Sequence, residues 1–264
     1  MSAGREFSDD VSKTGRVRDA VLAAGVAVLL WQALVWVTGV PPFILPGPWR
    51  VAESLVANAA LIGEHALTTI AEVLIGLLLG AALGAATALH LMISPLARRL
   101  VLPIMVFSQA VPVFALAPIL TLWFGYGMAS KIAMALLIIY FPVVSTFYDG
   151  LRRTDPGLLD LARTMGAPPS RTLVFLRLPA ALPAFGSGLR LAAVYAPIGA
   201  VIGEWVGASK GLGYLMLLAN GRAKTDLMFA ALFVLALFAV VLYAAVSAFT
   251  RRMTRWSSET TDAG

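Results

Sequence analysis

Six long apolar stretches are the feature that most limits how this chain can fold. A helix needs ~20 mostly apolar residues to cross a bilayer, because lipid offers no hydrogen-bond partner to an exposed backbone. Charged residues make up only 13% of the 264 residues, whereas a soluble domain carries about 25%. The sequence therefore predicts an all-α, polytopic membrane protein with six transmembrane helices. The stretches cover residues 20–38, 66–93, 101–124, 131–148, 186–206 and 227–249.

The first stretch could instead be the apolar part of a signal peptide, since it follows a basic tail. It is longer than the ~7–15 residues typical of that part, and it runs into Thr38–Pro42 without an Ala-x-Ala cleavage site. We therefore expect a cytoplasmic tail over 1–19 and an uncleaved transmembrane helix over 20–38.

Lysine and arginine fall mainly on one side of the expected membrane. With the N-terminus inside, fourteen of the 20 basic residues are cytoplasmic, and Arg190 lies near the start of the fifth stretch. Short loops rich in Lys and Arg stay in the cytoplasm, so both termini are expected there, with a second tail over 251–264. The net charge of +6 is spread over four cytoplasmic segments, which argues against a nucleic-acid partner. The external basic residues are Arg50, Lys131, Lys210, Arg222 and Lys224.

Small residues recur every four positions in the second and fifth stretches. Such a ridge lets the backbone of another helix approach closely. We expect stretches two to five to form a packed inner bundle, and the first and last, which are apolar nearly all round, to face lipid. The ridge residues are Gly76, Gly80, Gly84 and Ala88 in the second stretch, and Gly188, Ala192, Ala196 and Ala200 in the fifth.

Four prolines lie inside the third, fourth and fifth stretches. Each removes one backbone hydrogen bond and is expected to kink its helix. They are Pro112, Pro118, Pro142 and Pro197.

A polar segment, residues 149–185, separates the fourth and fifth stretches. Asp155 followed by Pro156 is typical of a helix start, and Gly166 stands where a helix C-terminus favours a left-handed residue. A second helix is expected to start at residues 168–170 and to end at Pro179. The segment is thus predicted to be a helical hairpin on the cytoplasmic face. One interpretation is an amphipathic hairpin lying on the membrane surface.

The spacing of residues in this hairpin supports another interpretation. It resembles the permease signature of ATP-binding-cassette (ABC) importers, the EAA loop. Asp160 replaces the usual Glu, Leu161 the first of two Ala, and Leu176 the usual Ile. The residues that carry the resemblance are Asp160, Leu161, Ala162, Gly166, Leu176, Leu178 and Pro179.

The resemblance implies a type I importer transmembrane domain over 65–250, in which the hairpin couples a separate ATPase subunit to the membrane helices. The chain contains no Gly-x-x-x-x-Gly-Lys-Ser/Thr motif, so ATP and Mg are expected on the ATPase, with no cofactor bound here. The family also implies an extracytoplasmic solute-binding protein and a place in the bacterial inner membrane. Because six spans are few for a complete pathway, a homodimer is expected.

Further motifs are similar to the nitrate, sulfonate and taurine group of these permeases. Within it, residues 197–207 and 151–155 are most similar to permeases assigned to hydroxymethylpyrimidine, a thiamine precursor. This cargo is our expectation, with sulfonate, taurine or nitrate as the alternative. The motifs of the wider group lie at residues 42–48, 109–112, 122–127 and 211–214.

Five polar residues within the stretches are candidates for lining a translocation pathway. A carboxylate inside a bilayer is costly and is a functional candidate by default. Structural roles compete with this interpretation, because Glu72 is expected in the first turn of its helix, where the helix dipole favours an acid. The uncharged candidates could equally join helices by hydrogen bonds. The five are Gln109, Tyr140, Tyr195, Glu204 and Glu72.

Two other classes of protein remain open. A proton-coupled secondary transporter could use Glu72, Glu204 and His90 as a proton relay, although the hairpin would then be unexplained. An intramembrane enzyme is disfavoured, because the sequence offers no Cys and no His-Glu-x-x-His. His65 and His90 lack the spacing of metal ligands, so no metal site is expected.

Overall fold

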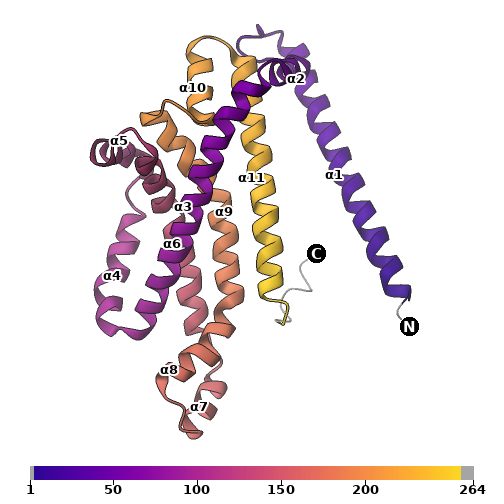
Figure 1. Ribbon diagram of the computed structural model, residues 1–264. Helices are drawn as coiled ribbons and strands as arrows, with labels where there is room; N and C mark the ends of the chain where they lie inside the picture. Colours follow the sequence, from indigo (N-terminus) through magenta and orange to yellow (C-terminus); the bar gives the residue numbers. More distant parts are fainter. Residues whose placement is uncertain (1–2, 257–264) are drawn as a thin grey trace. The chain divides into compact units, whose positions relative to one another are not determined.

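The computed structural model describes residues 3–256, and side chains of the first helix chiefly from residue 22 onward. No β-strand occurs within 3–256, in agreement with the predicted all-α class. Figure 1 shows the helices in chain order. They are α1 (Ala3–Thr38), α2 (Pro48–Ala57), α3 (Ala59–Ile93), α4 (Pro95–Ser108), α5 (Val113–Phe124), α6 (Met128–Arg152), α7 (Pro156–Thr164), α8 (Pro169–Thr172), α9 (Leu178–Gly207), α10 (Leu212–Gly221) and α11 (Thr225–Met253), with a π-helical turn at Leu173–Arg177 between α8 and α9.

Four helical segments of the described chain are each long and apolar enough to cross a membrane: α3, α6, α11 and the run Pro169–Gly207. The third predicted stretch corresponds to α4 and α5 together, which would make a fifth crossing. The first corresponds to the apolar part of α1, Leu22–Thr38, which is shorter. The predicted stretches thus coincide with helices, but composition and length identify four or five of them as spans.

The third stretch is not the single kinked helix that the sequence predicted. The axes of α4 and α5 differ by 104° across the break at residues 109–112. Pro112 has no backbone N–H to donate and holds the residue before it away from helical angles, so the helix stops and restarts. By contrast, Pro118, Pro142 and Pro197 lie inside continuous helices.

The chain forms two compact units, which are described separately. The smaller comprises residues 3–59 and 218–230, and the larger residues 60–217 and 231–256. In the smaller unit, Trp31 stacks on Phe229 with ring centroids 5.9 Å apart, and the hydroxyl of Thr225 donates to the carbonyl of Pro42 at 3.2 Å. These contacts hold the start of α11 against α1 and against the loop that follows α1.

Helix α6 is the centre of the larger unit, because both small-residue ridges pack against it. A Cβ on Gly76 would lie 2.9 Å from the Cβ of Ala135, and one on Gly84 would lie 2.8 Å from Val143. On the other side, a Cβ on Gly188 of α9 would collide with the side chain of Thr146 in α6. Real Cβ atoms do not approach so closely, so the helices α3, α6 and α9 require these glycines. The expectation of close helix approach is confirmed, with α6 as the shared partner.

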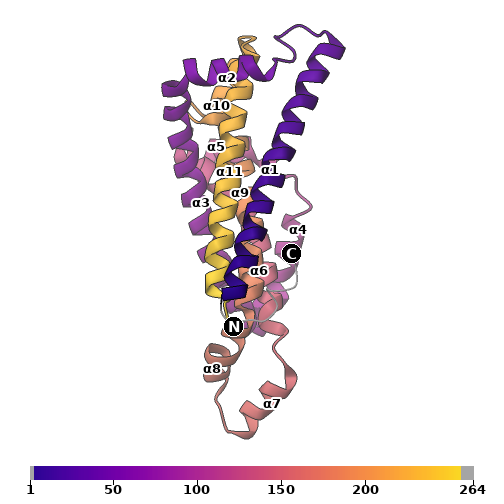
Figure 2. The ribbon, with the colours of Figure 1, turned by 90° about the vertical axis from the view of Figure 1, so that its right-hand side faces the viewer.

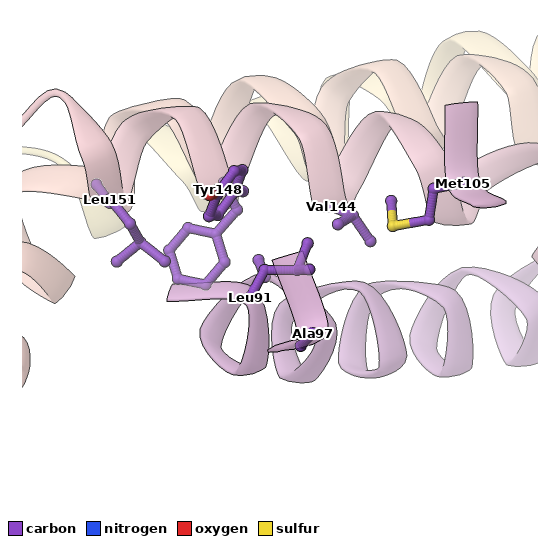
Figure 3. Close-up of a cluster of buried hydrophobic side chains, with 9 residues drawn as sticks. Leu91, Ala97, Met105, Val144, Tyr148 and Leu151 are labelled. Atoms are coloured by element: carbon purple, nitrogen blue, oxygen red, sulfur yellow. The ribbon is translucent and has the colours of Figure 1, made fainter. Parts of the chain in front are cut away.

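A cluster of apolar side chains closes one end of this unit, where α3, α4 and α6 meet (Figure 3). Leu91 and Leu151 are fully buried there, and Tyr148 and Met105 nearly so. The hairpin made by α7 and α8 projects beyond this end, and α10 begins at the opposite end (Figures 1 and 2). On α11, apolar side chains such as Leu237 and Val240 are more than half exposed, as suits a helix that faces lipid.

Candidate functional site

The first limb of the hairpin is α7, and its two ends are built as the sequence predicts. The carboxylate of Asp155 accepts a hydrogen bond from the backbone N–H of Gly157 at 2.6 Å, and Pro156 is the first helical residue. At the other end Gly166 has φ +71°. The N–H of Ala167 donates to the carbonyl of Ala162, and that of Gly166 to the carbonyl of Arg163, each at 2.9 Å. This pair of bonds is the Schellman motif, which turns the chain sharply.

The second limb differs from the prediction, because it does not end at Pro179. The short helix α8 continues through the π-helical turn Leu173–Arg177 directly into α9. In that turn the N–H of Leu178 donates to the carbonyl of Leu173, five residues back. The wider turn shifts the hydrogen-bond register next to Pro179, whose missing N–H would otherwise interrupt an α-helix. The second limb of the hairpin and the membrane helix are therefore one continuous helical run, Pro169–Gly207.

The residues that carry the importer signature divide between the tip and the base of the hairpin. At the tip, Asp160 pairs with Arg163 at 2.9 Å, with both side chains more than 70% exposed, and Ala162 is buried. Leu161 is more than half exposed, so α7 presents an apolar surface. At the base, Leu178 packs against the apolar cluster at the end of the bundle. Leu176 and Pro179 are half-buried.

Arg177 ties the base of the hairpin to the bundle. Its guanidinium donates to the carbonyl of Leu151 at the end of α6 at 3.0 Å, and it lies 3.9 Å from the sulfur of Met92 in α3. A cavity of about 600 Å³ opens between the hairpin and the end of α3. Its lining includes Met92, Ile93, Leu159, Arg163, Leu173 and Arg177.

A group of buried polar side chains lies at the end of the bundle opposite the hairpin. The ammonium of Lys131 in α6 lies 3.1 Å from a carboxylate oxygen of Glu72 in α3, and both side chains are almost fully shielded from solvent. Glu72 is far inside α3, which begins at Ala59. The prediction that it occupies the first helical turn is therefore wrong, and Lys131, rather than the helix dipole, is its partner.

Glu204, near the end of α9, is the other buried acid, with 1% of its surface exposed. Its carboxylate accepts a hydrogen bond from the hydroxyl of Thr69 at 2.6 Å, from the N–H of Gly213, and from the N–H of Tyr214 at 3.2 Å. Thr69 in turn accepts from the N–H of Leu212 at 2.7 Å. These bonds cap the start of α10 and join it to α3 and α9.

The other predicted pathway residues are not brought together with the two acids. Tyr140 donates to the hydroxyl of Thr87 at 3.0 Å, a bond between α6 and α3. Gln109 lies in the break between α4 and α5, and the Tyr195 side chain is 41% exposed on α9. His90 is exposed near the end of α3. Their roles in a pathway stay predictions.

Sequence reasoning missed three polar residues of the buried group. The charge count places Lys131 outside the membrane, because the residue stands at the very start of an apolar stretch. Thr69 carries no distinctive pattern. His65, whose ring Nδ1 accepts from the N–H of Gly211 at 3.0 Å, is noted in the sequence only as lacking the spacing of a metal ligand. One signal was available for Lys131: a lone cation at the edge of a span is the natural partner for an acid buried in another.

Comparison with known proteins gives one family over most of the chain. The sequence model described as "Binding-protein-dependent transport system inner membrane component" matches residues 73–255. A probable ABC transporter permease protein of Haemophilus influenzae is 52% identical over 86% of this chain and 93% of its own length.

Two of the relatives that are named for a cargo are at least 34% identical to this chain. The formylaminopyrimidine transport permease protein ThiX of Halalkalibacterium halodurans is 35% identical over 87% of this chain and 92% of its own length. The riboflavin transport system permease protein RibX of Chloroflexus aurantiacus is 34% identical over 88% and 87%.

The fold is also similar to a solved structure. A chain of the MetNI methionine ABC transporter, solved in inward-facing conformations, superposes with a TM-score of 0.65 at 21% identity, covering 75% of this chain and 99% of that one.

Proposed function

Because this chain belongs to the family of binding-protein-dependent transport system inner membrane components and is a membrane-embedded permease subunit of an ABC importer, we propose that its cargo is hydroxymethylpyrimidine or a related pyrimidine precursor of thiamine. The observation that carries this proposal is the similarity, over most of the chain, to a permease named for formylaminopyrimidine. A riboflavin permease is almost as similar. Both names denote nitrogen heteroaromatic compounds, which favours that chemical class over a sulfonate or nitrate.

The proposed assembly has two copies of this chain in the bacterial inner membrane, with both termini in the cytoplasm. Each hairpin docks on a cytoplasmic ATPase subunit, which binds the ATP and Mg. A solute-binding protein delivers the cargo on the other side. The excess of Lys and Arg around the hairpin and the termini supports this orientation.

The geometry of the hairpin suits a docking element. Its tip combines exposed apolar side chains, such as Leu161 and Met165, with the exposed pair of Asp160 and Arg163. Its base is fixed by Arg177 and by the continuous helix into α9. A partner that binds the tip can therefore displace α9 rather than merely bend a loop.

The test is uptake by the reconstituted importer. The permease, its ATPase and its binding protein are placed in proteoliposomes, and labelled hydroxymethylpyrimidine is offered with ATP inside. We expect ATP-dependent uptake that excess unlabelled formylaminopyrimidine reduces and excess taurine does not. Competition by taurine, with no inhibition by either pyrimidine, would instead establish the sulfonate alternative.

The same vesicles separate the importer from a proton-coupled transporter. A relay from Glu72 to His90 would have to cross eighteen residues of one helix, about 27 Å at 1.5 Å per residue. We expect uptake to survive a proton uncoupler while ATP is held constant, and to stop when the ATPase is inactivated. The reverse pattern would establish the secondary transporter.

A further inference from the structure

Glu204 is the meeting point of three helices. Glu204 belongs to α9. Its carboxylate is hydrogen-bonded to Thr69 of α3 and to the backbone N–H groups of Gly213 and Tyr214 in α10. The side chain is almost fully buried, so each bond is shielded from water. Breaking any of them would leave a buried polar group without a partner, which is costly. The start of α10 is therefore firmly attached to α9 and α3.

The backbone around Glu204 is shaped to fit the carboxylate. Gly211 has φ +117°, and a Cβ there would collide with the Glu204 carboxyl group. A Cβ on Gly213 would lie 2.9 Å from a Glu204 oxygen. Only glycine permits so close an approach at either position. The glycines of the Gly-Leu-Gly sequence at 211–213 are therefore needed to make room for the buried carboxylate of Glu204.

Additional contacts fasten the same turn to α3. The N–H of Gly211 donates to the ring of His65 at 3.0 Å, and the N–H of Leu212 donates to Thr69 at 2.7 Å. Every backbone N–H from 211 to 214 thus ends on a side chain of α3 or α9. The turn has no freedom to move without breaking several bonds at once.

Helix α9 connects this turn to the hairpin at the other end of the bundle. The helical run from Pro169 to Gly207 is unbroken, because the π-helical turn bridges Pro179. A displacement of the second limb of the hairpin can therefore reach Glu204 along one continuous helical run. From there the shortest bonded route leads into α10.

We propose that Glu204 is a positioning residue of transport: its carboxylate makes α10 move with α9, so that a displacement of the hairpin at one end of the bundle repositions α10 at the other. The residue acts through α10 and contacts no cargo. This inference rests on the proposed role of the hairpin in docking an ATPase, but not on the identity of the cargo.

The experiment uses a spin label on α10, which is straightforward because the chain contains no Cys. Leu217→Cys places the label on an exposed position of that helix. Spectra are recorded for the complex with its ATPase subunits in nanodiscs, without nucleotide and with ATP trapped. With Glu204 present, we expect the spectrum to change between the two states.

In the Glu204→Gln variant we expect that response to vanish. The amide keeps the shape of the carboxylate but accepts the three hydrogen bonds poorly. Cargo uptake should fall about tenfold or more, as for the loss of a bond to a charged group, while the ATPase continues to hydrolyse ATP. Glu64→Gln is the matched control, since it removes the exposed pair with Lys210 at the same end of α3; it should leave the response and uptake unchanged.

Two outcomes overturn the proposal: a label at Leu217 that does not respond to nucleotide when Glu204 is present, or a Glu204→Gln variant with a normal response and normal uptake. If that variant fails to assemble, Thr69→Val removes the bond to Glu204 together with the bond from the N–H of Leu212, and should weaken the response in the same direction; a full response in Thr69→Val would then overturn the proposal. The spectra require no cargo. A wrong cargo assignment would therefore abolish hydroxymethylpyrimidine uptake while leaving the nucleotide response of the label intact.

Discussion

Lys131 shows how one residue decides whether a buried acid is tolerated. Glu72 is fully buried among apolar helices, and the ammonium of Lys131 is the cation beside it at 3.1 Å. Removing one member of a buried pair leaves the other charged and without compensation, at a cost of ~3–5 kcal/mol. Replacing both members by neutral groups avoids that cost.

We therefore expect Lys131→Met to lower the thermal unfolding temperature of the purified permease strongly. The double variant Lys131→Met with Glu72→Gln should recover most of the loss. Lys210→Met, which breaks only the exposed pair with Glu64, should change the unfolding temperature little. Fluorescence-monitored unfolding in detergent measures all three. A single and a double variant of equal stability would show that the pair does not act as a unit.

The charged residues also show where sequence reasoning reaches its limit. A charge count assigns topology from position along the chain, so Lys131, at the edge of an apolar stretch, looks like part of a loop. Its true environment is set by Glu72 and by Gly203, whose missing side chain lets α9 approach the backbone of Lys131. Only the packing of three helices reveals that.

At the scale of elements, Gly166 determines the shape of the hairpin tip. Its φ of +71° lies in the left-handed region, which costs other residues roughly 1–2 kcal/mol and β-branched ones more. We expect Gly166→Val to reach the membrane in normal amount but to lose ATP-driven uptake, because α7 is misplaced. Gly166→Asn should retain much of the activity, since Asn tolerates this conformation.

Quantitative membrane blotting and vesicle uptake test both variants. Normal transport by Gly166→Val would contradict the coupling role of the hairpin. Loss of transport in both variants to the same extent would contradict the conformational explanation.

The two limbs of the hairpin illustrate what local patterns predict. The start and end of α7 depend on neighbouring residues, Asp155 and Gly166, and both were predictable. The continuation through Pro179 was not, because it depends on a π-helical turn whose hydrogen bonds follow no apolar period. Similarly, Pro112 predicts that the helix is disturbed at this position. Whether the helix kinks there or breaks by 104° depends on what packs around the proline.

At the scale of the whole molecule, the proposed orientation can be tested with single cysteines. Ser209 lies in the exposed turn before α10, and Ser170 lies exposed on α8 of the hairpin. In intact cells whose outer membrane is opened, a membrane-impermeant maleimide should label Ser209→Cys. It should label Ser170→Cys only after the inner membrane is permeabilised. The opposite pattern would reverse the topology inferred from Lys and Arg.

The number of apolar stretches, the helical class and the importer family follow from the sequence because each depends on many residues at once. The buried group of Glu72, Lys131, Glu204 and Thr69 depends on contacts between helices distant in sequence. Polarity inside a span marks two of its members, the acids, as unusual. It does not identify their partners, which only the folded bundle brings within bonding distance.

The ion pair between α3 and α6 also bears on how the chain is made. A lysine inside a span opposes membrane insertion by ~2.5–3.5 kcal/mol at the bilayer centre and by less near an edge. Synthesis runs from the N-terminus, so Glu72 has already left the ribosome when Lys131 emerges. We therefore expect α6 to enter the bilayer alongside α3, with its charge neutralised on arrival. Glu204 comes last, and the earlier helices already offer Thr69 as its first partner.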